Sequence, residues 1–344
     1  MNIALLPMTL CSYLFKSVVV LREFFYRKGI FQSHRLPCKV ISIGNITVGG
    51  TGKTPATCLI ARHFKNAGCK VAVLSRGYRA KGGTEPLIVS DGKRVIAGPE
   101  IAGDEAVMLA QKLPGVPILA GKNRFLLGQR AIHEFSAQAL LLDDGFQHYP
   151  LQRDLDIVLI NARNPFGNGF LLPRGTLREA LSSLKRTPLI VLTKVEETTE
   201  VIKLEELIRR YSPNSHIFRA SVQAASLRRL ADNAAVALEK MRNKAVVALC
   251  SIGDPESFFS MLENLGCRIV KKIAFTDHHW YNSDDYTVIN ACGQGADFIV
   301  TTEKDVVKLD KNMIDSKKLF ILETEMRIDR EDEFFQTLST LAGL

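Results

Sequence analysis

The chain has 344 residues, of which 46% are apolar and 24% charged, with a formal net charge of +9. These values are typical of a folded protein and, without repeats or low-complexity tracts, argue against a disordered chain. The length exceeds the size at which one hydrophobic core stops growing, so we expect one large domain and a smaller one. The seven cysteines are scattered and never spaced as C-x-x-C, which suggests neither a disulfide framework nor a zinc site and fits a reducing cytosol.

The N-terminal segment, residues 1–30, combines an apolar run with basic charge. Residues 1–15 carry no charged side chain, and residues 1–40 hold six Lys or Arg against one acid. The run is too short to span a bilayer and lacks the features of a secretory signal. We predict an interfacial helix over residues 1–27 that lies on an anionic membrane surface. The alternative is a helix packed on the protein's own core. No basic patch with interleaved aromatics supports nucleic acid as a partner.

Short apolar runs alternate with helical stretches from residue 40 onward. The runs at 40–44, 70–75, 116–121, 139–145, 155–161 and 188–194 are rich in Val, Ile and Leu. Because they lack polar alternation, they indicate strands covered on both faces, and the rhythm predicts a mainly parallel α/β sheet. Together with the glycine-rich loop described below, the expected fold is P-loop NTPase-like. Ligands are then expected at the carboxyl ends of the strands.

A second series of apolar runs follows at 245–253, 297–305 and 319–325, after a charged stretch at 225–244 that we interpret as helical. We place the domain junction near residue 230. The prediction is a nucleotide-binding domain at 31–229 and a smaller α/β domain at 230–344.

A glycine-rich loop follows the first strand and precedes a helix opened by Pro55, which is the context that a phosphate loop requires. Its glycines let backbone N–H groups surround phosphate oxygens, and the helix adds its positive end. Lys53 would pair with the β and γ phosphates of ATP, and Thr54 would bind Mg²⁺. The loop departs from G-x-x-x-x-G-K-[ST] at its first position, so a glycine-rich turn that binds nothing stays an alternative. The predicted nucleotide-binding residues are Thr47, Val48, Gly49, Gly50, Thr51, Gly52, Lys53 and Thr54.

Two acids end the apolar run at 139–144, where a phosphate loop needs a carboxylate for its metal. We choose Asp143 as the Mg²⁺ ligand, although either acid could contact the metal and a solvated turn is an alternative. Asp144, Gln147 and His148 would then lie where substrate or phosphate binds. A loop histidine without function explains His148 equally well. Asp104 stands at the start of a helical run, where it could also act only as a cap.

Seven ordered segments resemble the tetraacyldisaccharide 4'-kinases, the lipid A 4'-kinases of Gram-negative bacteria. They are NITVGGTGKTP at 45–55, LSRGYRAK at 74–81, GDEAVMLA at 103–110, DDGFQHYPLQRDLDIVLIN at 143–161, GNGFLLPRGTLREAL at 167–181, DHHWY at 277–281 and TTEKD at 301–305. The resemblance implies two α/β domains with the active site between them. It also implies transfer of the ATP γ-phosphate to the 4'-hydroxyl of a tetraacylated glucosamine disaccharide 1-phosphate, giving lipid IVA. The expected place is the cytoplasmic face of the bacterial inner membrane, with the protein attached peripherally or monotopically.

The resemblance carries a catalytic Asp and His pair onto Asp104 and His278, with adjacent His279 as the alternative partner. An imidazole oriented by a carboxylate could take the proton of a sugar hydroxyl. A metal-binding histidine pair is the other interpretation, but adjacent side chains rarely converge on one ion. Arg76 and Tyr78 follow a strand and are expected to contact phosphate or substrate.

Arg178 and Glu179 lie in another of the family segments, although a helix-surface ion pair would explain them as well. TTEKD receives no physical role from the sequence. No obligate protein partner is indicated.

Two other classes of function stay open. Thr193-Lys194-Val195-Glu196 resembles the guanine-reading T-K-x-D motif of a GTP-dependent switch or metallochaperone, but its last residue is one methylene longer. A non-catalytic membrane-binding module would account for residues 1–27 and leave the phosphate loop unexplained.

Overall fold

The computed structural model describes residues 6–77, 86–195 and 199–344. Thirteen strands in these ranges form one sheet, ordered β11-β10-β12-β13-β8-β7-β6-β1-β5-β2-β4-β3, with β9 paired to β8. Most neighbours are parallel; the antiparallel pairs are β13 with β8, β3 with β4, and β8 with β9. The mainly parallel α/β fold with an N-terminal helix is therefore confirmed.

The first lobe consists of β1 to β7 and the helices around them. Its strands are buried on both faces, as their unbroken apolar runs predict. The strands are β1 (Lys39–Gly44), β2 (Val71–Ser75), β3 (Leu87–Ser90), β4 (Ile118–Ala120), β5 (Ala139–Asp143), β6 (Leu155–Asn161) and β7 (Leu189–Thr193). The helices are α2 (Lys53–Asn66), α3 (Pro99–Ala102), α4 (Asp104–Lys112), α5 (Arg124–Phe135), the 3-10 turn η2 (Leu181–Arg186) and α6 (Thr199–Tyr211).

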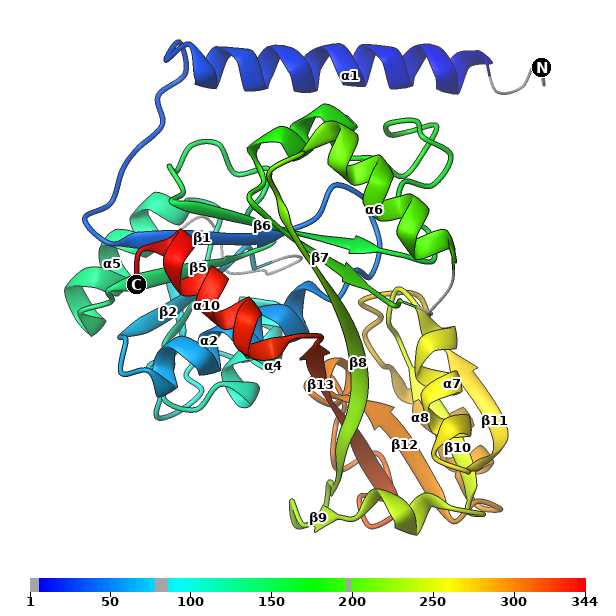
Figure 1. Cartoon of the computed structure of the whole chain (residues 1–344). Helices are drawn as coiled ribbons and strands as arrows, with labels where there is room; N and C mark the ends of the chain where they lie inside the picture. The colour runs from blue at the N-terminus through cyan, green and yellow to red at the C-terminus, as the bar shows by residue number, and fades with distance from the viewer. Residues whose placement is uncertain (1–5, 78–85, 196–198) are drawn as a thin grey trace.

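The second lobe extends the same sheet. It contains β10 (Ala245–Cys250), β11 (Arg268–Ala274), β12 (Phe298–Thr302), α7 (Pro255–Asn264), α8 (Ser283–Gly293) and α9 (Glu303–Val306). Figure 1 shows this lobe below the first one, with its strands tilted against those above.

Two long strands, β8 (His216–Arg229) and β13 (Leu319–Ile328), join the lobes. β8 pairs with β7 over residues 216–220 and with β13 over residues 220–229. The helix expected over 225–244 is wrong. The chain there completes β8, forms the short strand β9 (Ala235–Val236) and makes the 3-10 turn η3 (Leu238–Met241). Pairing of Leu227 with Leu322 of β13 outweighs the local helical propensity.

The C-terminal helix α10 (Glu331–Ala342) returns to the first lobe. Phe334 and Leu338 lie in the same buried cluster as Ile41 and Ile43 of β1. Helix α10 thus completes the core of the first lobe. The predicted boundary near residue 230 stays a prediction.

Helix α1 (Leu6–Arg27) lies on the outside of the first lobe (Figure 1). One face of the helix contacts the lobe: Ser12 Oγ donates to the Leu171 carbonyl at 2.8 Å, and Tyr26 stacks on Tyr149 with centroids 5.6 Å apart. Phe15 packs on the same lobe. The alternative interpretation, a helix packed on the protein itself, therefore holds for one face of α1.

The opposite face of α1 carries an apolar stripe at helical spacing. Leu10, Leu14, Val18 and Leu21 are 64%, 61%, 62% and 52% exposed. A helix packed only on its own protein would bury such a stripe. No helix in the described ranges is both long enough and apolar enough to cross a membrane.

Candidate active site

The phosphate loop connects β1 to α2 and is held from both sides. Asn45 Nδ2 donates to Thr51 Oγ1 at 2.9 Å, and Thr193 Oγ1 donates to the Thr51 carbonyl at 3.0 Å. Gly49 and Gly52 have φ values of 106° and 82°, a region that side chains with a Cβ rarely adopt. The loop is therefore fixed in a shape that needs glycine.

The phosphate loop opens into a cleft of about 1050 Å³ between the lobes. All eight predicted nucleotide-binding residues line it. The other walls come from the middle of β8 at 221–224 and from the second lobe at 252–254, 257–258, 277–278 and 302–304. The carboxyl ends of strands from both lobes thus face one space, as expected for an α/β sheet.

Asp143 ends β5 at the floor of this cleft and is buried. Thr57 Oγ1 donates to its Oδ1 at 3.0 Å. Burial, with Glu105 and Asp144 nearby, raises the pKa of Asp143 to about 7. A buried carboxyl beside two further acids favours a cation, so the donor set fits Mg²⁺.

In the described residues, three or more His, Cys, Asp or Glu side chains nowhere form a metal-binding group. Mg²⁺ that binds with nucleotide phosphates ordinarily takes one or two carboxylates, and Thr54 lines the cleft with Asp143.

Asp144 lies between two cations. Arg178 Nη1 donates to its Oδ1 at 2.8 Å, and Lys53 Nζ is 3.8 Å from the same oxygen. Burial would raise the pKa of Asp144, but Lys53 and Arg178 outweigh it and lower the pKa. Asp144 therefore holds the side chains of Lys53 and Arg178 on the same side of the cleft.

The helix-surface ion pair considered for Arg178 and Glu179 is wrong. Both residues precede the turn at 181–186, and Arg178 also donates to Asn45 Oδ1 at 3.1 Å. Glu179 is buried and accepts from Arg186 at 2.8 Å and from the Tyr149 hydroxyl at 3.2 Å. Arg178 thus supports the phosphate loop, and Glu179 supports the surface on which α1 packs.

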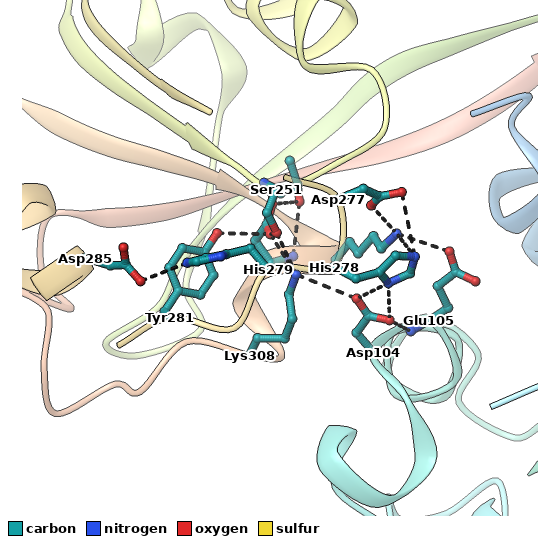
Figure 2. Close-up of polar contacts among 12 residues, drawn as sticks. Asp104, Glu105, Ser251, Asp277, His278, His279, Tyr281, Asp285 and Lys308 are labelled. Atoms are coloured by element: carbon teal, nitrogen blue, oxygen red, sulfur yellow. Dashed lines mark hydrogen bonds and ion pairs between the residues drawn. The ribbon is translucent and has the colours of Figure 1, made fainter. Parts of the chain in front are cut away.

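Asp104 and His278 meet across the cleft (Figure 2). Nδ1 of His278 is 3.0 and 2.9 Å from the two carboxylate oxygens of Asp104. Asp104 begins α4 in the first lobe, whereas His278 follows β11 in the second lobe. His279 lies away from this contact, with Nε2 2.8 Å from Asp285 and its ring stacked on Phe275. The structure places His278, and not His279, against Asp104.

Asp104 keeps its charge in this environment. Burial would raise the pKa of Asp104, but the hydrogen bond from His278 and the ammonium groups of Lys304 and Lys308 lower it. Lys308 Nζ is 3.6 Å from Asp104 Oδ2 and is itself fully buried. An ionised carboxylate that accepts from Nδ1–H fixes the orientation of an imidazole.

The TTEKD segment at 301–305, to which the sequence alone assigns no role, supplies three separate contacts. Glu303 accepts from Lys112 of α4 at 2.6 Å and from the backbone of Thr324 at 3.0 Å. Asp305 is buried among Ser251, the Tyr281 hydroxyl at 3.1 Å and Lys308 at 3.2 Å. Lys304 lies beside the pair formed by Asp104 and His278, with its Nζ 3.3 Å from His278 Nε2. The signal for these roles is absent from the sequence because the partners lie far away in the chain.

Asp144 is described above, and the other predicted substrate residues differ in where they lie. Arg76 lines the cleft and is exposed. Tyr78 lies outside the described residues. Gln147 donates through Nε2 to the Asn45 carbonyl at 2.8 Å, whereas its Oε1 is buried with no hydrogen-bond partner. His148 lies outside the cleft lining, and burial together with the charges of Arg124 and Arg153 lowers its pKa to about 3. His148 is thus neutral at physiological pH.

Arg124, which no sequence motif singles out, is a further candidate for binding an anion. It is buried at the start of α5, and its Nε has no hydrogen-bond partner. Burial and the charge of Arg76 lower its pKa to about 10. A buried guanidinium with an open donor beside a second arginine suits an anionic group. Arg124 is distinguished by its burial, and burial of a single arginine cannot be recognised from the neighbouring residues in the sequence.

Lys194, in the T-K-x-E sequence, forms an ion pair with Asp254 at the start of α7. This contact joins the end of β7 to the second lobe and occupies the lysine of the suspected guanine motif. Glu196 lies outside the described residues.

A family model, curated relatives and a solved structure resemble this chain over most of its length. A family model described as tetraacyldisaccharide-1-P 4'-kinase matches residues 2–342. A curated tetraacyldisaccharide 4'-kinase from Syntrophus aciditrophicus (strain SB) is 41% identical over 336 residues, covering 94% of this chain and 89% of the relative. Another, from Halothermothrix orenii, is 36% identical over 327 residues, covering 91% and 85%. A crystal structure of LpxK from Aquifex aeolicus in complex with ATP matches with a TM-score of 0.79 at 31% identity and covers 98% of both chains.

Proposed function

The chain belongs to the tetraacyldisaccharide-1-P 4'-kinase family, and we propose that its cleft transfers the γ-phosphate of ATP to the 4'-hydroxyl of a tetraacylated disaccharide 1-phosphate. The observation that carries the proposal is that the phosphate loop and His278 line one cavity. A phosphate donor and a proton acceptor therefore face the same space. This is the arrangement that phosphoryl transfer to an alcohol needs.

The phosphate loop is the proposed ATP site. Backbone N–H groups of 49–54 would bind the phosphates, and Lys53, oriented by Asp144, would bind their outer oxygens. When bound, Mg²⁺ would neutralise charge on the phosphates, with Asp143 and Thr54 as its protein ligands.

His278 is the proposed general base. Asp104 accepts from Nδ1, so Nε2 is the nitrogen that would take the proton of the 4'-hydroxyl as the oxygen attacks the γ-phosphorus. The new oxygen–phosphorus bond forms while the bond to the β,γ-bridging oxygen breaks and ADP leaves. Since Asp104 and His278 come from different lobes, the base is complete only when the lobes are together.

The acceptor is proposed to enter from the side of α1. Arg76 and the buried Arg124 would bind its 1-phosphate. Tyr78 is proposed as a further substrate contact from its sequence position alone. Gln147 Oε1 would accept from the sugar or from an acyl amide. Neutral His148 would act by contact and not as an acid or base.

Helix α1 is proposed to bind the cytoplasmic face of the inner membrane through the stripe at 10, 14, 18 and 21. The exposed stripe and the basic charge near it suit the boundary between acyl chains and anionic headgroups.

The test is an incubation with ATP, Mg²⁺ and the acylated disaccharide 1-phosphate in detergent, followed by detection of a 4'-phosphate. Lys53→Ala is the matched control, which we expect to abolish the product. GTP in place of ATP separates a kinase of this kind from a switch protein. Folded protein that leaves the disaccharide unmodified would refute the proposal.

A further inference from the structure

Lys304 approaches the second ring nitrogen of His278. The lysine follows β12 at the start of α9, and its side chain is 13% exposed. Its Nζ is 2.9 Å from Asp277 Oδ1, 3.2 Å from Glu105 Oε1 and 3.3 Å from His278 Nε2. These contacts match the three N–H donors of an ammonium group.

The contacts indicate which ring nitrogen of His278 donates and which accepts. An ammonium group only donates, so Nε2 must accept from Lys304, and the ring proton lies on Nδ1 facing Asp104. Burial would lower the pKa of Lys304, but Glu105, Asp277 and Asp104 outweigh it and raise the pKa, so the lysine stays charged. Nε2 of His278 is thereby held as an acceptor, with its lone pair on the cleft side.

Lys304 is also close to the phosphate loop. It lines the same cavity as residues 47–55. Its partner Asp277 lies against Gly253: a Cβ built on this glycine would be 3.3 Å from Asp277 Oδ2 and 3.9 Å from the backbone nitrogen of Gly50. The second lobe thus brings Asp277, the carboxylate partner of Lys304, next to the phosphate loop.

The acidic side chains around the His278 imidazole would repel a phosphate, so the reaction needs a cation there. The acids Asp104, Glu105 and Asp277 face it together with Lys304 and, behind Asp104, Lys308. A γ-phosphate that approaches this group of acids would be repelled unless a cation stands between them. Lys304 is the ammonium group that contacts Nε2 there.

We propose that Lys304 is a catalytic residue that exchanges its contact with His278 Nε2 for one with the transferring phosphoryl group. This rests on the proposed kinase reaction. The 4'-hydroxyl replaces Lys304 at Nε2 and gives its proton to that nitrogen as the oxygen–phosphorus bond forms and ADP leaves. The third N–H of Lys304, released from Nε2, donates to a non-bridging oxygen of the phosphoryl group. Asp277 and Glu105 keep the ammonium in place throughout.

The experiment compares Lys304→Met with the wild type in steady-state kinetics over a range of pH. We expect kcat to fall about 100-fold or more, while the Kd for ATP changes less than about threefold. The acidic limb of the kcat/KM profile should move to higher pH, because the cation that opposes protonation of the imidazole is gone. Lys304→Arg, which keeps the charge, should recover at least about tenfold of the lost kcat. A lysine that only braces the fold would leave the pH profile unmoved.

Lys272→Met is the matched control, since Lys272 pairs with Glu263 on the surface and should leave kcat unchanged. If Lys304→Met unfolds early in a thermal melt, Lys304→Gln takes its place under the same criteria. A folded variant with kcat within about threefold of wild type, or a loss explained by weaker ATP binding, overturns the proposal. Failure of the wild type to phosphorylate the disaccharide would instead refute the kinase function.

Discussion

Asp104 and His278 lie 174 positions apart in the chain, yet the shorter of their two contacts is only 2.9 Å. Asp104 is placed by the start of α4 and His278 by the loop after β11. The buried Lys308 and Asp305 lie behind Asp104 on the side of the second lobe. The pair therefore depends on the contact between the lobes.

We expect His278→Ala to lower kcat by about 10²–10⁴-fold, the usual range for loss of a general base. The Kd for ATP should change little, because His278 is not among the phosphate-loop residues. Adding Asp104→Ala to this variant should cost little more, since the two residues act as a unit. Single-turnover rates and nucleotide titration measure both quantities. His279→Ala, whose side chain contacts Asp285, is the control and should keep most of kcat. Equal losses in ATP binding and in kcat would contradict the role as a base.

Lys112 and Glu303 join the two lobes through a buried ion pair of 2.6 Å, with side chains 11% and 12% exposed. Lys112→Met would leave Glu303 buried without its cation, so we expect the free energy of unfolding to fall by about 3 kcal/mol. Urea denaturation measures this. Arg94→Ala is the control, because Arg94 pairs with Asp91 but is 82% exposed, and its loss should cost less than about 0.5 kcal/mol. Similar values for the two variants would mean that the buried pair adds nothing.

The parts of this protein that could be predicted are those whose signal is local. The phosphate loop needs glycines, a lysine and a threonine in one run, and Asp143 ends an apolar strand, so both could be read from adjacent residues. The buried parallel strands were likewise visible as unbroken apolar runs. In each case the structural reason lies within about ten residues of the chain.

The parts that were missed depend on distant partners. The second half of β8 has a helical composition, and its strand conformation depends on β13, which begins some 90 residues later in the chain. Lys304 had no role until Glu105 and Asp277 were placed beside it. Arg124 was overlooked because burial, and not residue type, marks it. His278 was identified through the family resemblance, since two adjacent histidines alone do not say which one faces a carboxylate.

Asp143 should make the protein less stable as pH rises when neither nucleotide nor Mg²⁺ is bound. Its pKa is about 7 in the folded protein against an ordinary value of 3.8. The folded state therefore binds the proton more tightly, and this contribution, complete below about pH 4, is lost as pH rises through 7. We expect Asp143→Asn to raise Tm at pH 8 and to have little effect at pH 4.

Thermal melts across this range test the sign. Addition of ATP with Mg²⁺ at pH 8 is the matching control, because it should stabilise the wild type much more than Asp143→Asn. If Asp143→Asn melts below the wild type at pH 8 without ligands, the ionised Asp143 carboxylate does not destabilise the folded protein and the prediction is wrong.

Helix α1 provides the last prediction, which separates its two faces. Replacing Leu10, Leu14, Val18 and Leu21 with Ser removes the exposed stripe and leaves the contacts of Ser12 and Tyr26 with the first lobe. Each of these side chains would lose about 1.5 kcal/mol or more of transfer free energy, so binding to anionic vesicles should weaken by more than about 100-fold. Tm should stay the same, because exposed side chains contribute little to folding. Co-sedimentation with vesicles measures the binding.

The matched variant Tyr26→Ala should lower Tm while it keeps vesicle binding, since its ring packs on Tyr149 and the stripe is intact. Unchanged vesicle binding in the four-residue variant would assign the membrane contact to another surface.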